Sequence, residues 1–149
     1  MPNTNVNIVI RSVQHFDGLE PERVEQKAEG CLEKTPFGWT LTYLEGEETG
    51  MGGTRTTLEL AENRVTLTRA GEVSSQMIFE AGGIHTSDYQ TPYGVLPLEV
   101  HTHSLGAEMS QKGGRVALCY HIRLGPQQSG RTELSLEVTS GGKREEEEI

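Results

Sequence analysis

The sequence predicts an all-β protein, folded as an antiparallel barrel or sandwich of nine or ten strands. Turn signals recur about every 8–12 residues along the 149-residue chain, a spacing typical of short strands joined by tight turns. Between these signals apolar and polar residues alternate, as they do on half-buried strands. The loops are short enough to join neighbouring strands, which favours a meander of consecutive hairpins that closes into a barrel.

Alternation predicts strands over 5–16, 38–45, 54–60, 64–69, 75–80, 84–90, 95–104, 116–124 and 132–139. The apolar residues of these segments are expected to point inward: Ile8, Ile10, Leu41, Tyr43, Leu58, Leu67, Met77, Phe79, Leu98, Val100, Leu118, Tyr120, Leu134 and Leu136. The segment 105–113 is expected to be the loop between the two strands that flank it. The glycine-rich, acidic segment 46–53 is expected to be a mobile loop.

One segment, 21–32, fits two kinds of structure. Pro21 at a first turn favours a helix, whereas alternation from Val24 through Gln26 to Leu32 favours a strand. Gly30 disfavours the helix by ~1 kcal/mol relative to alanine, and the pattern alone leaves both alternatives open.

Short turn sequences separate the predicted strands. Glu62-Asn63 indicates a hairpin, and Gly82-Gly83 indicates another because both glycines accept positive φ without steric cost. Thr91 to Gly94 suits a β-turn with Pro92 at its second position.

Composition and charge exclude some classes of partner and location. The net charge of -9 argues against non-specific binding to nucleic acid or to an anionic membrane. We expect one domain over residues 1–142 and an acidic, disordered tail over 143–149. The N-terminus has no signal-peptide pattern, and no run approaches the ~18 apolar residues of a membrane helix. We therefore expect a cytoplasmic protein in which Cys31 and Cys119 are free thiols.

Two residues interrupt the regular pattern of apolar interior and polar exterior. Arg69 falls on the same side as Val65 and Leu67, and an inward charge is costly unless it is paired or meets an anionic ligand. Its place at a strand end also allows it to reach solvent or to pair with a carboxylate there. Pro97 cannot donate a ladder hydrogen bond, so its strand is expected to be bulged or open at that point.

Four residues on the outer face of two predicted strands have the ligand types that zinc uses. If 95–104 and 114–124 form a hairpin, His101 and His103 lie on the same outer surface as Cys119 and His121. A solvated polar face explains the same residues, because histidine alternating with leucine is typical of any half-exposed strand. Metal binding is therefore the weaker alternative, and we expect no cofactor.

Catalytic motifs do not stand out in the sequence. His85, Asp88 and Tyr89 could form an acid–base group, but the chain contains no nucleophile elbow, phosphate-binding glycine loop, HExxH or CxxC. We assign no catalytic residues and favour a protein that is not an enzyme.

Four stretches in the central part of the chain are distinctive: Val65 to Gly71, Met77-x-Phe79, His85 to Gly94 and Leu96 to Val100. Through these stretches the chain resembles the YwiB-like proteins, a bacterial family of unknown function. The resemblance implies a small lipocalin-like (calycin-type) barrel of about 8–10 strands without established activity, substrate or cofactor. It also implies that Arg23 to Leu32 is a strand.

These observations favour a binding module for a small, partly apolar ligand in the barrel, with Arg69, Tyr89 and Tyr93 as candidate contacts. The first alternative is a protein–protein interaction barrel without a ligand, in which the acidic loop binds a partner. The second is a metal-binding or hydrolytic protein that uses His101, His103, Cys119 and His121. A homodimer is a further expectation, because the strand that carries Pro97 could leave an open edge.

Overall fold

The computed structural model describes residues 3–16, 18–46, 53–125 and 128–140. The predicted acidic tail, and most of the predicted mobile loop, lie outside these residues. The ten strands are β1 (Asn3–Phe16), β2 (Glu22–Thr35), β3 (Gly38–Leu44), β4 (Arg55–Ala61), β5 (Arg64–Ala70), β6 (Ser75–Phe79), β7 (Ile84–Thr91), β8 (Gly94–Ser110), β9 (Gly113–Leu124) and β10 (Gln128–Ser140).

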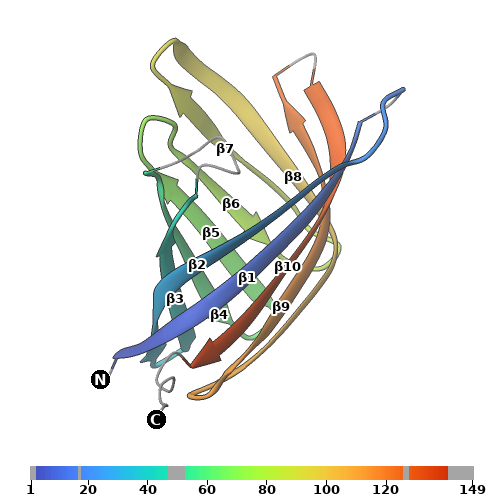
Figure 1. Cartoon of the computed structure of the whole chain (residues 1–149). Helices are drawn as coiled ribbons and strands as arrows, with labels where there is room; N and C mark the ends of the chain where they lie inside the picture. Colours follow the sequence, from blue (N-terminus) through green and yellow to red (C-terminus); the bar gives the residue numbers. More distant parts are fainter. Residues whose placement is uncertain (1–2, 17, 47–52, 126–127, 141–149) are drawn as a thin grey trace.

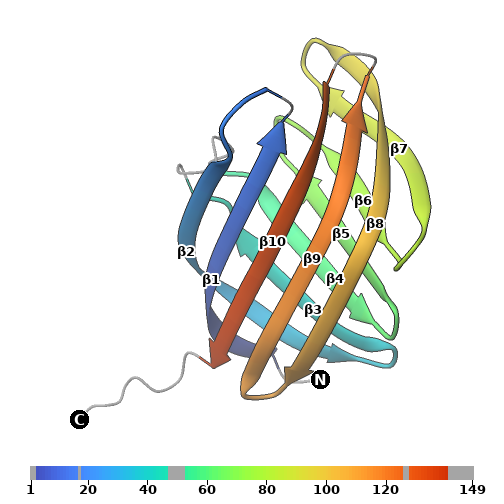
Figure 2. The ribbon, with the colours of Figure 1, turned by 90° about the vertical axis from the view of Figure 1, so that its right-hand side faces the viewer.

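The strands form one antiparallel sheet that curls into a nearly closed barrel (Figures 1 and 2). The strand order is β6-β5-β4-β3-β2-β1-β10-β9-β8-β7, so neighbours in space are neighbours in sequence, except that the first strand pairs with the last. This confirms the predicted all-β meander barrel. Long strands dominate one wall, where β1 and β10 pair continuously from Val6↔Ser140 to Phe16↔Gly130.

The two ends of the sheet, β6 and β7, meet at a seam where the described residues form a single bridge, between Ser74 and Gln90. The predicted hairpin at Gly82-Gly83 is therefore wrong in its pairing, although a turn does connect the two strands. Gly82 and Gly83 instead exchange backbone hydrogen bonds with Thr102 of β8, at 2.9 and 3.0 Å. They extend the β7–β8 ladder and leave β6 and β7 apart along most of their length.

The ambiguous segment 21–32 is a strand, as the family resemblance implies. β2 pairs with β1 from Gln14↔Glu22 to Asn3↔Glu33. Gly30 suits this strand because a Cβ there would collide with the backbone oxygen of Thr42 on β3. Close approach of two strand backbones is one of the few reasons for glycine inside a strand.

The predicted loop over 105–113 is wrong, because β8 continues to Ser110 and turns tightly into β9 at Gln111 and Lys112. The register between β8 and β9 shifts between Thr102 and Ser104, where His103 is the extra residue of a bulge. A bulge inserts one residue and moves the following residues to the opposite faces. Inward-facing residues therefore have even numbers before the bulge and odd numbers after it. Because of this change, the second half of the strand does not continue the alternation of the first half.

The bulge or opening that was predicted at Pro97 does not occur there. Pro97 pairs with Asp88 of β7, and its carbonyl accepts a hydrogen bond of 2.9 Å from the Gly125 amide. The β8–β9 ladder begins one residue later, at Leu98↔Leu124. The ring nitrogen of Pro97 thus occupies a position just beyond the ladder, where no donor is needed. Because β8 has neighbours on both sides here, Pro97 does not create the open edge on which the homodimer prediction rested.

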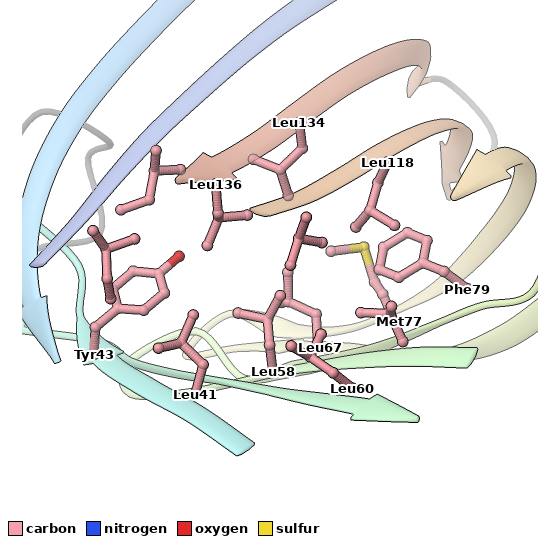
Figure 3. Close-up of a cluster of buried hydrophobic side chains, with 14 of the residues drawn as sticks. Leu41, Tyr43, Leu58, Leu60, Leu67, Met77, Phe79, Leu118, Leu134 and Leu136 are labelled. Atoms are coloured by element: carbon pink, nitrogen blue, oxygen red, sulfur yellow. The ribbon is translucent and has the colours of Figure 1, made fainter. Parts of the chain in front are cut away.

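Every apolar residue named above as pointing inward is buried in the barrel core. Figure 3 shows side chains from β3 to β6 meeting those of β9 and β10 across the interior. Phe79, Leu41, Leu58 and Val65 have no accessible surface, and the Phe79 ring packs 4.7 Å from that of Tyr120. The centre of the barrel is therefore filled by its own side chains.

Candidate functional site

The candidate site lies at one end of the barrel, which we call the mouth. Here the odd-numbered strands end and the even-numbered strands begin. The long strands β8, β9 and β10 reach beyond the short strands β4, β5 and β6 at this end (Figures 1 and 2). Inward-facing side chains of the mouth are thus only partly covered by the core.

A buried carboxylate, Glu45, organises one side of the mouth. Its side chain is 1% exposed. The side-chain amide of Gln26 donates to Glu45 Oε1 at 2.9 Å, and the Thr56 hydroxyl donates to Oε2. Gln26 is held in turn because its Oε1 accepts the Gly46 amide at 2.8 Å. Hydrogen bonds of this kind offset the cost of removing a charged carboxylate from water.

Arg69 lies beside this carboxylate, with its Nε 3.5 Å from Glu45 Oε2. The sequence predicted an inward charge at Arg69 that would need a partner or a ligand, and the structure supplies a partner. The Arg69 side chain is 19% exposed, so it is neither sealed in the core nor free in solvent. We call Gln26, Glu45, Thr56 and Arg69 the polar half of the mouth.

Gln26 and Glu45 were not among the candidate residues predicted from the sequence. A signal for both was present, because two-residue alternation places Gln26 with Ala28 and Glu45 with Tyr43 on inward faces. Their contact with each other could not be predicted, since it joins the start of β2 to the residue after β3.

The charges of the polar half act on two buried tyrosines, Tyr43 and Tyr120. Burial raises the pKa of the Tyr43 phenol above its ordinary range, and the negative charge of Glu45 raises it further. Burial also raises the pKa of Tyr120, while the Arg69 guanidinium and a hydrogen bond with Thr132 oppose that rise. Arg69 therefore acts electrostatically on both β3 and β9, which are separated by several strands in the sheet order.

The opposite side of the mouth is apolar. Tyr89, Ile122 and Leu124 are partly buried and pack against the core. Leu96 remains 42% exposed, and it lies beside Gly125 at the end of β9. We call Tyr89, Leu96, Ile122 and Leu124 the apolar half of the mouth.

Of the three candidate ligand contacts, Arg69 and Tyr89 have inward positions at this end of the barrel. Tyr93 does not join them. It lies in the turn between β7 and β8 and is 98% exposed, while its amide donates to the Thr91 hydroxyl at 3.1 Å. Its ring therefore faces solvent.

The histidine face predicted from the sequence lies on the outer surface of β8 and β9. His101 and His121 are paired across the strands, with ring centroids 6.4 Å apart. The bulge displaces His103, so Cys119 is opposite Ser104 instead. His101 Nε2 lies 3.1 Å from Glu99, and His121 Nε2 lies 2.6 Å from the Ser129 hydroxyl. Within the described part of the chain, no three histidine, cysteine or acidic residues are arranged to hold a metal ion.

The sequence suggested an acid–base group of His85, Asp88 and Tyr89. Among the described residues, the His85 side chain is hydrogen-bonded to neither of the other two. Its Nε2 lies 2.8 Å from Glu80 Oε1, and Arg64 Nε donates to Glu80 Oε2 at 2.9 Å. These hydrogen bonds, from His85 first and then from Arg64, lower the pKa of Glu80. The group is an ion-pair cluster at the end of the barrel opposite the mouth.

Two further expectations concern the whole chain. Cys31 and Cys119 are free thiols, as predicted. Across residues 3–16, 18–46, 53–125 and 128–140, the structure contains no helix that could span a membrane.

Comparison with known proteins identifies the family but no activity. The chain is 24% identical over 138 residues to the uncharacterized beta-barrel protein YwiB of Bacillus subtilis (strain 168), which covers 93% of this chain and 95% of that protein. The crystal structure of the ywiB protein from Bacillus subtilis has the same fold, with a TM-score of 0.83, 22% identity and 93% coverage of both chains. The family model for a domain of unknown function, DUF1934, matches residues 8–136. The chain belongs to the DUF1934 family, as the resemblance to YwiB-like proteins had indicated.

Proposed function

We propose that the protein binds a small, partly apolar molecule at the mouth of its barrel. The observation that carries this proposal is the division of the mouth into a polar half and an apolar half. Small-molecule sites combine apolar walls with a few polar groups that fix orientation. Here the polar half provides the partly exposed guanidinium of Arg69, and the apolar half provides partly exposed leucine, isoleucine and tyrosine side chains.

The filled core supports the mouth, rather than the centre, as the place of binding. Barrels of about eight strands have interiors that side chains just fill or that hold one small ligand. In this barrel Leu58, Leu67, Met77 and Phe79 occupy the centre. A ligand would thus rest on the core as a floor, between the two halves of the mouth. In this respect the protein would work as a shallow counterpart of a lipocalin-like barrel.

The cytoplasm is the location that we infer for this binding protein. The two free thiols support it, since secreted proteins of this size usually oxidise paired cysteines.

The proposal is tested with N-phenyl-1-naphthylamine, an uncharged apolar dye whose fluorescence increases on burial. We expect saturable binding to the purified protein, followed by fluorescence titration. Leu96→Ser should weaken binding about five- to tenfold, because it removes part of the apolar wall, worth ~1 kcal/mol or more.

Val95→Ser is the matched control. Val95 is the preceding residue of β8 and is 59% exposed, but alternation places it on the other face of the strand. Its substitution should leave dye affinity unchanged. Absence of saturable binding, or equal weakening by the two substitutions, would contradict binding at the mouth.

A further inference from the structure

The guanidinium of Arg69 retains most of its hydrogen-bonding capacity. An arginine side chain carries five N–H donors in a fixed planar fork. Among the described residues, Glu45 is its only hydrogen-bond partner, and the contact uses Nε at the long distance of 3.5 Å. The four donors on the two terminal nitrogens are therefore not used within the described part of the protein.

Glu45 does not depend on Arg69 alone. Its two oxygens already accept hydrogen bonds from Gln26 and Thr56, which are both buried. The Nε edge of Arg69 faces this satisfied carboxylate. The edge formed by its terminal nitrogens has the geometry that binds a second oxyanion with two parallel hydrogen bonds.

The position of Arg69 also suits contact with a ligand. It is the penultimate residue of β5 and points inward, and 19% of its side chain is exposed at the mouth. Its Nε lies 3.5 Å from Glu45, the residue that follows β3, so the side chain extends across β4 instead of lying along its own strand. Tyr89, Ile122 and Leu124 belong to the apolar half that faces it.

We propose that the ligand at the mouth is a monoanion, whose oxyanion head group binds the terminal nitrogens of Arg69 while its apolar part lies against Tyr89, Leu96, Ile122 and Leu124. This inference rests on the proposed function. It adds a chemical class, because a carboxylate or sulfonate attached to an apolar body would satisfy both halves of the mouth. Selectivity for the anion would come from this local cation, since the net charge of the whole protein is -9.

The test compares two dyes that differ in one sulfonate group. 8-Anilinonaphthalene-1-sulfonate is an anion, and N-phenyl-1-naphthylamine is its uncharged counterpart. Both are titrated into the purified full-length protein at pH 7 while fluorescence is recorded. We expect the anion to bind at least tenfold more tightly than the uncharged dye, since hydrogen bonds to charged groups contribute more than neutral ones.

Substitution of the cation should remove this preference selectively. In Arg69→Gln, we expect affinity for the anionic dye to fall about tenfold or more and affinity for the uncharged dye to stay within about twofold. Arg69→Lys retains the charge without the planar fork and should give an intermediate anion affinity. Arg55→Gln is the charge-matched control, because Arg55 is an exposed residue of β4 near the same end of the barrel, and it should change neither affinity.

The outcomes separate the two proposals. Equal binding of both dyes to the unmodified protein, with no effect of Arg69→Gln, is one contrary result. This result would overturn the proposal that the ligand is an anion and would leave the proposal of binding at the mouth intact. Failure of both dyes to bind would overturn both proposals. Loss of anion binding in Arg55→Gln as well as Arg69→Gln would also overturn the anion site, because it would show a general effect of charge. Near-ultraviolet circular dichroism of each variant verifies that the dyes bind to folded protein. If Arg69→Gln does not fold, the comparison is made with Arg69→Lys.

Discussion

Ser74 and Gln90 exchange two backbone hydrogen bonds, of 2.9 and 2.8 Å, and form the single bridge between β6 and β7 in the described structure. Further along the seam a side chain replaces the ladder, because the Ser87 hydroxyl donates to the Gln76 carbonyl at 2.6 Å. The remaining wall of the barrel is continuous. The seam is thus the place where the closed sheet is weakest.

Backbone amides along the seam should exchange with solvent faster than those elsewhere in the sheet. Alternation from Ser74 and Gln90 directs the amides of Gln76 and Ile78 on β6, and of Asp88 on β7, toward the gap. Hydrogen exchange followed by NMR should therefore show lower protection for these amides than for those of the continuous β1–β10 ladder. Equal protection in both places would show that β6 and β7 pair fully in solution.

Breaking the buried pair at the mouth should destabilise the protein more than removing it as a unit. Glu45→Leu leaves the Arg69 guanidinium without its partner, and we expect a loss of about 2–4 kcal/mol in the free energy of unfolding, toward the lower end because Arg69 is 19% exposed. The double variant Glu45→Leu/Arg69→Met should recover much of this loss, since no uncompensated charge remains. Urea denaturation of both single variants and the double variant measures the coupling, and strict additivity would show that the two side chains act independently.

Tyr43 should make the protein less stable in alkaline solution. Burial raises the pKa of its phenol in the folded state above the ordinary value near 10. Above pH 10 the unfolded chain gains stability by ionising this tyrosine, whereas the folded chain keeps it neutral, so folding stability falls as pH rises. Urea denaturation at pH 8 and at pH 11 should show a smaller decrease for Tyr43→Phe than for the unmodified protein. An identical decrease would contradict the raised pKa, and Tyr93→Phe, at a side chain 98% exposed, controls for the loss of one phenolic hydroxyl.

Glu80 should make the folding stability of the protein depend on pH in acidic solution. Hydrogen bonds from His85 and then Arg64 lower the pKa of this carboxyl in the folded state. Its contribution to stability is therefore present above the pKa of the unfolded carboxyl and is lost as pH falls through the lower, folded value. Acid titration monitored by circular dichroism should show a shallower loss of stability below pH 5 for Glu80→Gln. The same profile in both proteins would argue against the ion-pair cluster.

Phe79 should be the most sensitive position of the barrel centre. Its side chain is fully buried and packs on Tyr120, so Phe79→Ala leaves a cavity and should cost about 3–5 kcal/mol. Tyr93→Ala removes an aromatic side chain of similar size from an exposed turn and should change stability by no more than about 0.5 kcal/mol. Comparable losses for the two variants in thermal or urea denaturation would indicate that Tyr93 is covered in solution.

Much of the barrel could be predicted from local patterns. Residues such as Leu41, Leu58 and Leu67 alternate with polar neighbours, and they are buried as expected. At Asn63 the chain adopts a φ of 66°, a turn conformation that asparagine tolerates better than most residues. Alternation also placed Arg69 inside, although the residue that pairs with it could not be identified from the pattern.

What could not be predicted depends on contacts between distant segments. The bulge at His103 follows from the register between β8 and β9, and it places Ser104 instead of His103 opposite Cys119. Similarly, Gly82-Gly83 looked like an ordinary hairpin, but it pairs with Thr102 and leaves the seam open.

The physical reason is that alternation is a property of neighbouring residues, whereas register and closure depend on the whole sheet. A side chain's face follows from its place along one strand, so the interior could be assigned before the strands were placed. The junction of β1 with β10, the seam between β6 and β7, and the pairing of Arg69 with Glu45 all require the barrel to close first. The chain therefore specified which residues face inward, and closure of the barrel brought a polar and an apolar half together at one mouth.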